Sequence, residues 1–221
     1  MKRTLIIGAS GGIGAALAQA VSVQGDDVVA LSRSHDGLDL TDEASVKAQL
    51  GALEGTFDTI IVATGALEID GAQPEKSIRL ISQKAMMDQF ALNAVGPALV
   101  LAHAADLLPK DKCCVFAVLS ARVGSIGDNR LGGWIGYRSA KAAVNQIVHT
   151  ASIELSRSHP ESICVALHPG TVATPFTEKY LGRHPAVAPD EAAKNLLQVI
   201  DGLSQQDTGG VFYWAGKSVL W

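Results

Sequence analysis

Short apolar runs alternate with helix-compatible stretches along the whole chain, and this alternation limits the possible folds more than any other feature. The runs are continuously apolar, which is typical of a parallel sheet covered on both faces. Six predicted strands are Thr4–Ile7, Val28–Leu31, Thr59–Val62, Cys113–Leu119, Ile163–His168 and Gly210–Tyr213. Five predicted helices lie near Ile13–Gln24, Ala44–Leu50, Ser82–Leu108, Gly136–Arg157 and Pro189–Asp201. The pattern predicts an α/β fold with a doubly wound parallel sheet.

No repeat, low-complexity tract or Pro/Gly/Ser-rich linker divides the chain, so residues 1–221 are expected to form a single domain. A further strand–helix pair is expected within residues 64–80. A small lid over the substrate is expected near residues 175–188.

Composition restricts the function classes. The chain is 48% apolar and 18% charged, which is typical of a globular protein, and its net charge of -4 argues against a nucleic-acid partner. Adjacent Cys113 and Cys114 lie in an apolar run and are expected to be buried, and no cysteine or histidine cluster suggests a metal. The apolar stretch at Ala98–Ala105 is far shorter than a membrane span. We therefore expect a cytoplasmic protein with neither a membrane nor a nucleic-acid partner.

A glycine-rich turn follows the first predicted strand directly and opens the first helix, as Gly8-Ala9-Ser10-Gly11-Gly12-Ile13-Gly14. Glycines there permit a tight turn and close approach of the backbone to a pyrophosphate. The helix N-terminus would face the phosphates with its free N–H groups. The turn predicts dinucleotide binding in a Rossmann fold.

The second strand ends at Ser32-Arg33-Ser34, where an NAD site would place an acid for the ribose, and no carboxylate occurs until Asp36. Arg33 is suited to a 2′-phosphate, although it is also compatible with a solvated surface charge. The segment favours NADP(H), with NAD(H) possible.

Tyr137 and Lys141 lie four residues apart at the start of a predicted helix, so one helical turn stacks the ammonium beneath the phenol. A nearby cation favours the phenolate, which suits a tyrosine to general acid–base chemistry. Ser120 ends a strand at the sheet edge where ligands bind, although a lone serine there is more often one that caps a turn. Asn93 precedes Gly96-Pro97, where the helix is expected to be distorted.

Another sharp turn, Pro169-Gly170-Thr171-Val172-Ala173-Thr174, follows the fifth predicted strand. Thr174 is placed to bind a nicotinamide carboxamide. His168, at the end of a buried strand, is expected to be a structural histidine with its polar atoms satisfied.

In this order and spacing, Gly8, Gly12 and Gly14 followed by Asn93, Ser120, Tyr137 and Lys141 resemble the short-chain dehydrogenase/reductase family. The resemblance spans essentially the whole chain, and LSARVGSIGDNRLGGWIGYRSAK followed by HPGTVATPF is most similar to the C-factor-like branch.

The resemblance implies roles for these residues. Tyr137 would be the general acid/base, Lys141 would lower its pKa and hold the nicotinamide ribose, Ser120 would stabilise the substrate oxygen, and Asn93 would position a relay water. The implied cofactor contacts are Gly8, Ser10, Gly12, Ile13, Gly14, Ser32, Arg33, Asp39, Leu40, Ala63, Gly65, Tyr137, Lys141, Pro169, Gly170, Val172 and Thr174. A homodimer or homotetramer is implied as well.

The chain departs from the family pattern at three places. The family's Asn-Asn-Ala-Gly is Val62-Ala63-Thr64-Gly65, and the Ala-Ser order before the lysine is Ser139-Ala140. The span through Gly127–Gly133 is longer than in many members and is expected to lie over the pocket. Arg122, Val123, Trp134, Phe176 and Tyr180 are candidate pocket walls.

Two functions from different classes compete. The first is an NADP(H)-dependent oxidoreductase that acts on a small carbonyl or alcohol substrate. The second is a cofactor-binding sensor or signalling protein with little turnover, because a fold does not determine a function.

Overall fold

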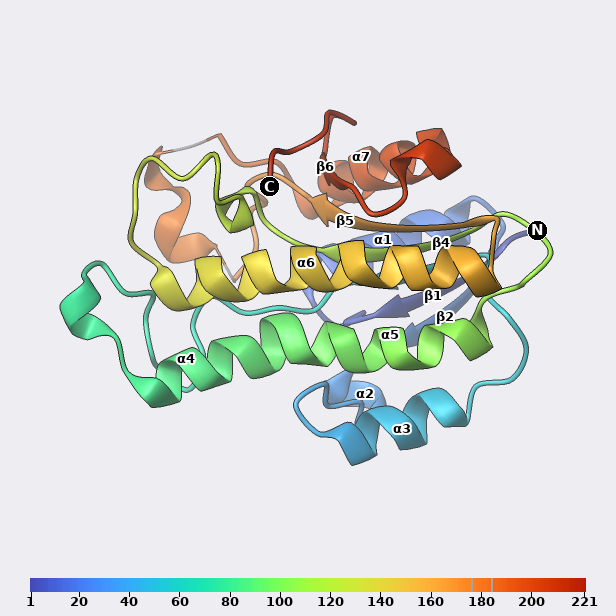
Figure 1. Cartoon of the computed structure of the whole chain (residues 1–221), viewed down its shortest axis with the longest axis horizontal. Helices are drawn as coiled ribbons and strands as arrows, with labels where there is room; N and C mark the ends of the chain where they lie inside the picture. The colour runs from blue at the N-terminus through green and yellow to red at the C-terminus, as the bar shows by residue number, and fades with distance from the viewer. Residues whose placement is uncertain (176, 184) are drawn as a thin grey trace.

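The computed structural model describes residues 1–175, 177–183 and 185–221. One parallel sheet runs in the order β2-β1-β3-β4-β5-β6 (Figure 1). Its strands are β1 (Arg3–Ile7), β2 (Asp27–Leu31), β3 (Thr59–Val62), β4 (Cys114–Leu119), β5 (Ser162–His168) and β6 (Val211–Tyr213). All six predicted strands are confirmed, with bounds that differ by at most one residue.

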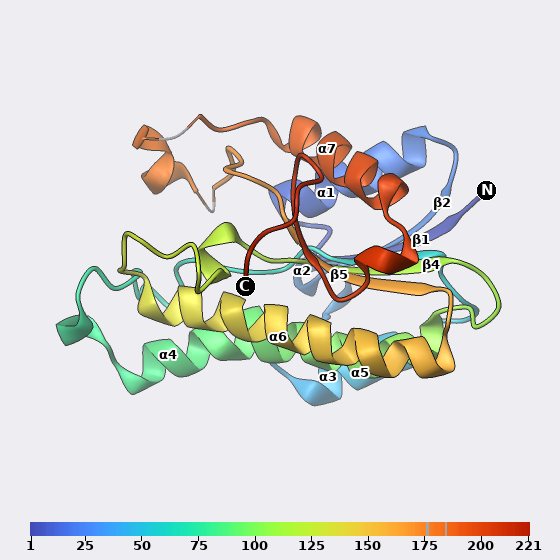
Figure 2. The same ribbon diagram turned by 45° about the horizontal axis from the view of Figure 1, so that its top comes forward.

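Helices cover both faces of the sheet, as Figure 2 shows. The α-helices are α1 (Gly12–Val23), α2 (Arg33–Asp36), α3 (Glu43–Gly51), α4 (Gln83–Phe90), α5 (Gly96–Leu107), α6 (Ile135–Ser158) and α7 (Pro189–Gly202). Short 3₁₀ turns lie at Ile78–Leu80, Arg122–Gly124, Glu178–Arg183 and Gln205–Asp207. Helices α1 and α7 pack on one face, and α3, α5 and α6 pack on the other. The doubly wound α/β prediction is confirmed.

Successive residues of a strand point to opposite faces of the sheet, so they enter two different apolar cores in turn. Phe116 and Val118 of β4 pack with Val144 of α6 in the first core. Leu119 of β4 and Leu167 of β5 pack with helices α1 and α7 in the second. Because both faces are buried, the strands need apolar residues at every position, which is the pattern in the sequence.

The sheet order reverses at β1, which lies between β2 and β3. Loops that leave adjacent strands in opposite directions open a crevice at the carboxyl ends, and ligands of doubly wound sheets bind there. The turns after β1 and β3 meet at this point, where Ala63 N–H donates a hydrogen bond to the Ile7 carbonyl at 2.7 Å.

The predicted helix Ser82–Leu108 is distorted, as expected, by the π-helical segment η2 (Ala91–Val95) between α4 and α5. The combined helix, Gln83–Leu107, is long and apolar enough to cross a membrane by length and composition alone. This extends well beyond the Ala98–Ala105 stretch considered in the sequence. The indication is weak, because the core helix of a soluble protein passes the same test, and Val100 and Ala104 are buried in the first core.

Two sequence expectations are wrong. Residues 64–80 hold no strand–helix pair; they form a loop with one isolated bridge, Ile69–Ala72, and the 3₁₀ turn Ile78–Leu80. Gly65, Gly71 and Pro74 leave too few consecutive residues there for a regular element. Cys113 is exposed, because β4 begins one residue later at the buried Cys114.

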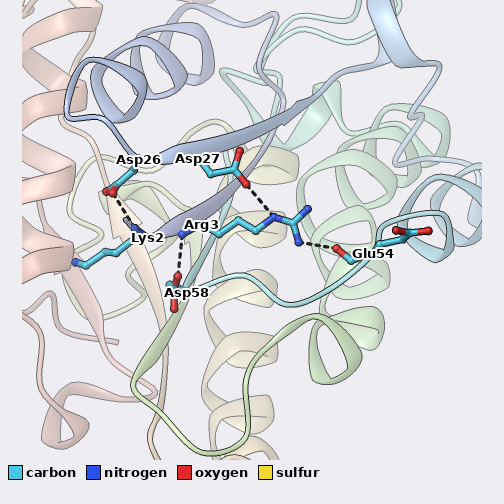
Figure 3. A network of polar contacts seen from close by, with 6 residues as sticks. All are labelled: Lys2, Arg3, Asp26, Asp27, Glu54 and Asp58. Atoms are coloured by element: carbon cyan, nitrogen blue, oxygen red, sulfur yellow. Dashed lines mark hydrogen bonds and ion pairs between the residues drawn. The ribbon is translucent and has the colours of Figure 1, made fainter.

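A polar network of Lys2, Arg3, Asp26, Asp27, Glu54 and Asp58 lies where β1 and β2 begin (Figure 3). Arg3 N–H donates to Asp58 at 2.8 Å, and Arg3 Nε donates to Asp27 at 3.1 Å. The Arg3 guanidinium also donates to the Glu54 carbonyl and lies 4.3 Å from the centre of the Phe57 ring. These contacts join the starts of β1 and β2 to the segment that enters β3.

Candidate active site

A cavity of about 380 Å³ lies at the carboxyl ends of β1, β3, β4 and β5. Its lining comprises Ser10, Gly11, Gly12, Ile13, Ala63, Thr64, Gly65, Leu119, Ser120, Ala121, Tyr137, Lys141, His168, Pro169, Gly170, Val172, Thr174, Pro175 and Thr177. The structure thus brings together twelve of the predicted site residues: Ser10, Gly12, Ile13, Ala63, Gly65, Ser120, Tyr137, Lys141, Pro169, Gly170, Val172 and Thr174.

The glycine turn forms the wall of the cavity at α1. Gly8 has φ 93° and lies so close to the β3 turn that a Cβ would be 2.9 Å from Thr64 Cγ2. A Cβ on Gly14 would lie 2.1 Å from the Gly8 carbonyl oxygen. Gly8 and Gly14 lie behind the lining and shape the turn. The turn fits a pyrophosphate, because α1 begins there with no side-chain cap and no acidic residue in its first turn.

A second turn, which follows β5, faces the glycine turn. Gly170 has φ 81°, and a Cβ there would lie 2.9 Å from Trp214. A Cβ on Gly12 would lie 2.7 Å from Thr174 Cγ2, so the two turns nearly touch. The predicted cofactor contacts from both ends of the chain therefore line one crevice.

The predicted 2′-phosphate segment lies outside this cavity lining. Ser32 caps the short helix α2 and its Oγ accepts a hydrogen bond from His35 N–H. Asp36 folds back and accepts a hydrogen bond from Ser32 N–H at 2.7 Å. Arg33 is exposed at the first position of α2. The Asp36 carboxylate therefore lies beside the end of β2, although Asp36 comes five residues after Leu31 in the sequence.

Asp39 and Leu40 also lie outside the lining. The Asp39 carboxylate accepts hydrogen bonds from Thr41 Oγ1 and Thr41 N–H at 2.7 and 2.9 Å, and these bonds hold its pKa below the usual value. Leu40 is buried in the first core, where a Cβ on Gly96 would approach its Cβ to 2.8 Å. Leu40 therefore packs against the start of α5.

Tyr137 and Lys141 lie one turn apart near the start of α6, with Lys141 Nζ 5.7 Å from the centre of the phenol ring. Lys141 Nζ donates a hydrogen bond to the Leu119 carbonyl at 2.9 Å. Burial raises the pKa of Tyr137 and lowers the pKa of Lys141 to about 8. Burial causes both shifts, because a charged group loses hydration when it is buried, and the expected effect of Lys141 on the Tyr137 pKa stays a prediction.

Ser120 hydrogen-bonds a residue that the sequence reasoning missed. Its Oγ donates to Asn145 Oδ1 at 2.6 Å, and both side chains are buried. Asn145 lies four residues after Lys141, so it faces the same side of α6 as the Tyr–Lys pair. The four-residue spacing from Lys141 is the sequence signal that could have identified Asn145. Asn145 holds the Ser120 hydroxyl on the side of the cavity that faces α6.

Asn93 lies in the π-helical segment and is fully buried, outside the cavity lining. Its Nδ2 donates to the Ala66 carbonyl at 3.0 Å and to Gln89 Oε1 at 2.8 Å. Its Oδ1 accepts from Ala66 N–H at 3.2 Å. A Cβ on Gly65 would lie 2.9 Å from Asn93 Oδ1 and 3.4 Å from Lys141 Nζ. Asn93 therefore buttresses the turn after β3, where the usual asparagines are missing.

Four of the candidate pocket walls lie outside the cavity lining: Arg122, Val123, Trp134 and Tyr180. The Trp134 ring packs edge-on against Tyr137 and Tyr180, with centroid distances of 6.5 and 5.4 Å. Tyr180 donates a hydrogen bond to Glu68 at 2.8 Å, which ties residues 177–183 to the loop after β3. Arg122 pairs with Asp128, and residues 127–133 do not line the cavity. Phe176, and position 184 of the expected lid, lie outside the described residues.

The parallel sheet, the glycine turn at a helix N-terminus and the Tyr–Lys pair at the sheet edge define a dinucleotide-binding type of α/β protein. Residues 37–182 match the family model for short chain dehydrogenase. The chain belongs to this family of oxidoreductases.

Two curated relatives show how far the similarity extends. The 1-hydroxy-2-glutathionyl-2-methyl-3-butene dehydrogenase of Rhodococcus sp. (strain AD45) is 27% identical over 236 residues, covering 100% of both chains. C-signal of Myxococcus xanthus is 34% identical over 138 residues, covering 62% of this chain and 78% of C-signal. The latter similarity agrees with the resemblance to the C-factor-like branch.

Solved structures share the fold. The NADPH-bound carbonyl reductase from chicken fatty liver superposes with a TM-score of 0.85 at 22% identity, covering 100% of this chain and 94% of that one. The carbonyl reductase Sniffer of D. melanogaster gives a TM-score of 0.82 at 18% identity over 100% of both chains. The Rossmann fold predicted from the sequence is confirmed.

Proposed function

We propose that the protein is an NADP(H)-dependent oxidoreductase that transfers a hydride between the nicotinamide and a small carbonyl or alcohol substrate. The observation that carries this proposal is the convergence of Ser120, Tyr137 and Lys141 on one cavity whose facing wall is the glycine turn. Family membership supports the reaction class, and the residues at the cavity support the individual roles.

The proposed roles follow from chemistry and position. When bound, the cofactor would supply the hydride in reduction or accept it in oxidation. Ser120 hydrogen-bonds the substrate oxygen, for which its hydroxyl turns from Asn145 toward the cavity. Tyr137 Oη gives its proton to that oxygen as the carbonyl becomes an alcohol, and takes it back in the reverse direction. Lys141 stabilises the phenolate left on Tyr137 and holds the nicotinamide ribose, while Asn93 supports the neighbouring turn.

Two features support NADP(H) over NAD(H). Arg33 is exposed at the end of β2, where a guanidinium can pair with a 2′-phosphate. The chicken carbonyl reductase of the same fold holds NADPH. Asp36 opposes this preference, because its carboxylate returns to Ser32 and would repel a phosphate. Titration with both cofactors decides between them, and tighter binding of NADH would overturn the Arg33 argument.

Replacement of the Tyr137 phenol tests the proposed chemistry. We expect Tyr137→Phe to lower turnover about 100-fold or more, because that is the usual contribution of general acid catalysis. NADPH affinity, measured by fluorescence titration, should fall by no more than about tenfold, because the phenol can contribute at most one neutral hydrogen bond to the cofactor. Tyr213→Phe, which removes a phenol hydroxyl outside the cavity lining and keeps the ring, is the matched control. A Tyr137→Phe protein that keeps more than about a tenth of the wild-type rate would rule out the role.

A sensor or signalling protein with little turnover is the second candidate. It is favoured by the 34% identity to C-signal of Myxococcus xanthus over 62% of this chain. The cavity with Ser120, Tyr137 and Lys141 in place argues for chemistry instead. Tight NADPH binding with no turnover across a broad carbonyl and alcohol panel would support the sensor.

We also propose a single domain over residues 1–221 with a lid near 175–188, a cytoplasmic location, and assembly as a homodimer or homotetramer. Assembly is supported by the exposed apolar side chains of Met87, Val95 and Ile153 on the outer helices. Light scattering after gel filtration measures the oligomeric state.

A further inference from the structure

His168 is the last residue of β5, and strand geometry fixes the direction of its side chain. Side chains alternate between the two faces of a sheet. Val118 of β4 and Ala166 of β5 both enter the core beneath α5 and α6. Ser120 and His168 follow two residues later, so both side chains lie on the α6 side.

The strand register makes Ser120 and His168 neighbours. Leu119 of β4 pairs with Leu167 of β5, and Ser120 N–H donates to the Leu167 carbonyl at 2.8 Å. Adjacent strands are about 5 Å apart, so the Ser120 and His168 side chains start about that far from each other. His168 in turn pairs with Tyr213 of β6, and their rings lie 5.3 Å apart.

One ring nitrogen of His168 lacks a partner. Nδ1 is buried and makes no hydrogen bond within the part of the chain that the structure describes, although His168 lines the cavity. Buried polar atoms are nearly always paired, so an unpaired nitrogen on a residue that lines a cavity requires an explanation, and a hydrogen bond formed once a ligand fills the cavity supplies one. Burial, with the nearby positive charge of Arg122, lowers the pKa of His168 to about 4. The imidazole is therefore neutral at neutral pH, with one donor and one acceptor nitrogen.

We infer that His168 is a substrate-binding residue that hydrogen-bonds a second polar group of the substrate, a few bonds from the carbon–oxygen bond held at Ser120. The inference rests on the proposed function, because Ser120 marks the reacting oxygen. It narrows the substrate class to carbonyl compounds with a nearby hydroxyl, such as hydroxyketones, in preference to simple ketones. His168 thereby differs from the satisfied structural histidine that its sequence position suggested.

A matched ligand pair tests this assignment without turnover. Calorimetric titration of the protein–NADP⁺ complex with 2-hydroxyacetophenone and with acetophenone compares two ligands that differ by one hydroxyl. We expect the hydroxyketone to bind about five- to tenfold more tightly, which is the effect of one neutral hydrogen bond. His168→Leu should remove this preference and leave acetophenone affinity within about twofold, whereas His168→Gln should retain part of it.

Labelled histidine gives a second readout that does not depend on the Leu variant folding. The ring signal of His168, assigned by its absence in either variant, should shift when 2-hydroxyacetophenone is added and stay in place with acetophenone. Equal affinities of wild type for the two ligands, including no binding of either, would overturn the assignment. So would a preference that persists in His168→Leu. A preference that depends on His168 in a protein without turnover would support this inference while contradicting the proposed enzyme.

Discussion

Burial controls the chemistry of Tyr137 and Lys141 at the scale of single residues. Burial disfavours the charged form of each group, so the Tyr137 pKa rises and the Lys141 pKa falls to about 8. At neutral pH the phenol keeps its proton and the lysine remains mostly charged. This is the protonation state that the proposed role of Tyr137 as proton donor to a carbonyl oxygen requires.

The lowered Lys141 pKa predicts a pH dependence. The ammonium is present below pH 8 and is lost as pH rises through about 8, and with it the charge that stabilises the Tyr137 phenolate. We expect kcat/KM for carbonyl reduction at saturating NADPH to fall above about pH 8. In Lys141→Arg, whose guanidinium stays charged, no fall should occur in that range. A wild-type profile that is flat to about pH 10 would contradict the assignment.

The sequence predicted most of the residues at the cavity, because glycine turns and strand ends can be located along the chain. It did not predict Asn145 at the site, and it did not predict that the Asp36 carboxylate returns to the end of β2. Both depend on hydrogen bonds that only the folded chain forms, with Ser120 and Ser32. Asp36 returns to Ser32 because α2 is a single short turn, which apolar periodicity cannot reveal. The burial that shifts the Tyr137 and Lys141 pKa values depends on packing, not on their spacing.

At the scale of elements, the junction of β1 with α1 depends on the absence of a side chain at Gly14. We expect Gly14→Ala to abolish NADPH binding and to destabilise the fold, because its Cβ would lie 2.1 Å from the Gly8 carbonyl oxygen. Gly51→Ala is the matched control: the added Cβ at the end of α3 has nothing within 4 Å, and helix propensity predicts a gain of up to about 0.5 kcal/mol.

Thermal unfolding and NADPH titration measure both variants. Normal NADPH affinity in Gly14→Ala would show that the turn can relax. A loss of affinity in both variants would show that glycine replacement disturbs the fold in general.

Regular elements were predictable wherever apolar residues repeat with a clear period. All six strands and every α-helix except α2 follow from the sequence, with α4 and α5 predicted as one helix. The secondary structure of residues 64–80 was predicted wrongly, because this segment combines apolar residues with glycine and proline. Long-range contacts also shape the loop: Gln89 donates a hydrogen bond to the Leu67 carbonyl at 3.0 Å. The sheet order also required the structure, because it depends on which strands pair.

At the scale of the whole molecule, the two ends of the sheet have different tasks. The carboxyl end carries the cavity, and the Arg3 network secures the amino end. We expect Arg3→Met to lower the free energy of unfolding by about 1 kcal/mol, because it removes hydrogen bonds to the Asp27 carboxylate and the Glu54 backbone carbonyl that are partly screened by solvent. Turnover per folded molecule should not change.

Denaturant unfolding checks this prediction against the exposed Lys2–Asp201 pair, whose side chains are 63% and 61% exposed. Asp201→Asn should change stability by less than about 0.5 kcal/mol. An Arg3→Met protein as stable as wild type would show that the network is replaceable by solvent.

The π-helical segment Ala91–Val95 has a consequence for comparing sequences of this kind. One extra residue in a helix turns everything after it by about 100° relative to what precedes it. The inward face of α4 and that of α5 therefore follow two different phases. A search for one uninterrupted amphipathic period across 83–107 would assign the wrong residues to the core on one side of Asn93. Alignments of this helix need a gap at the segment, and a deletion there would redirect a whole helix face.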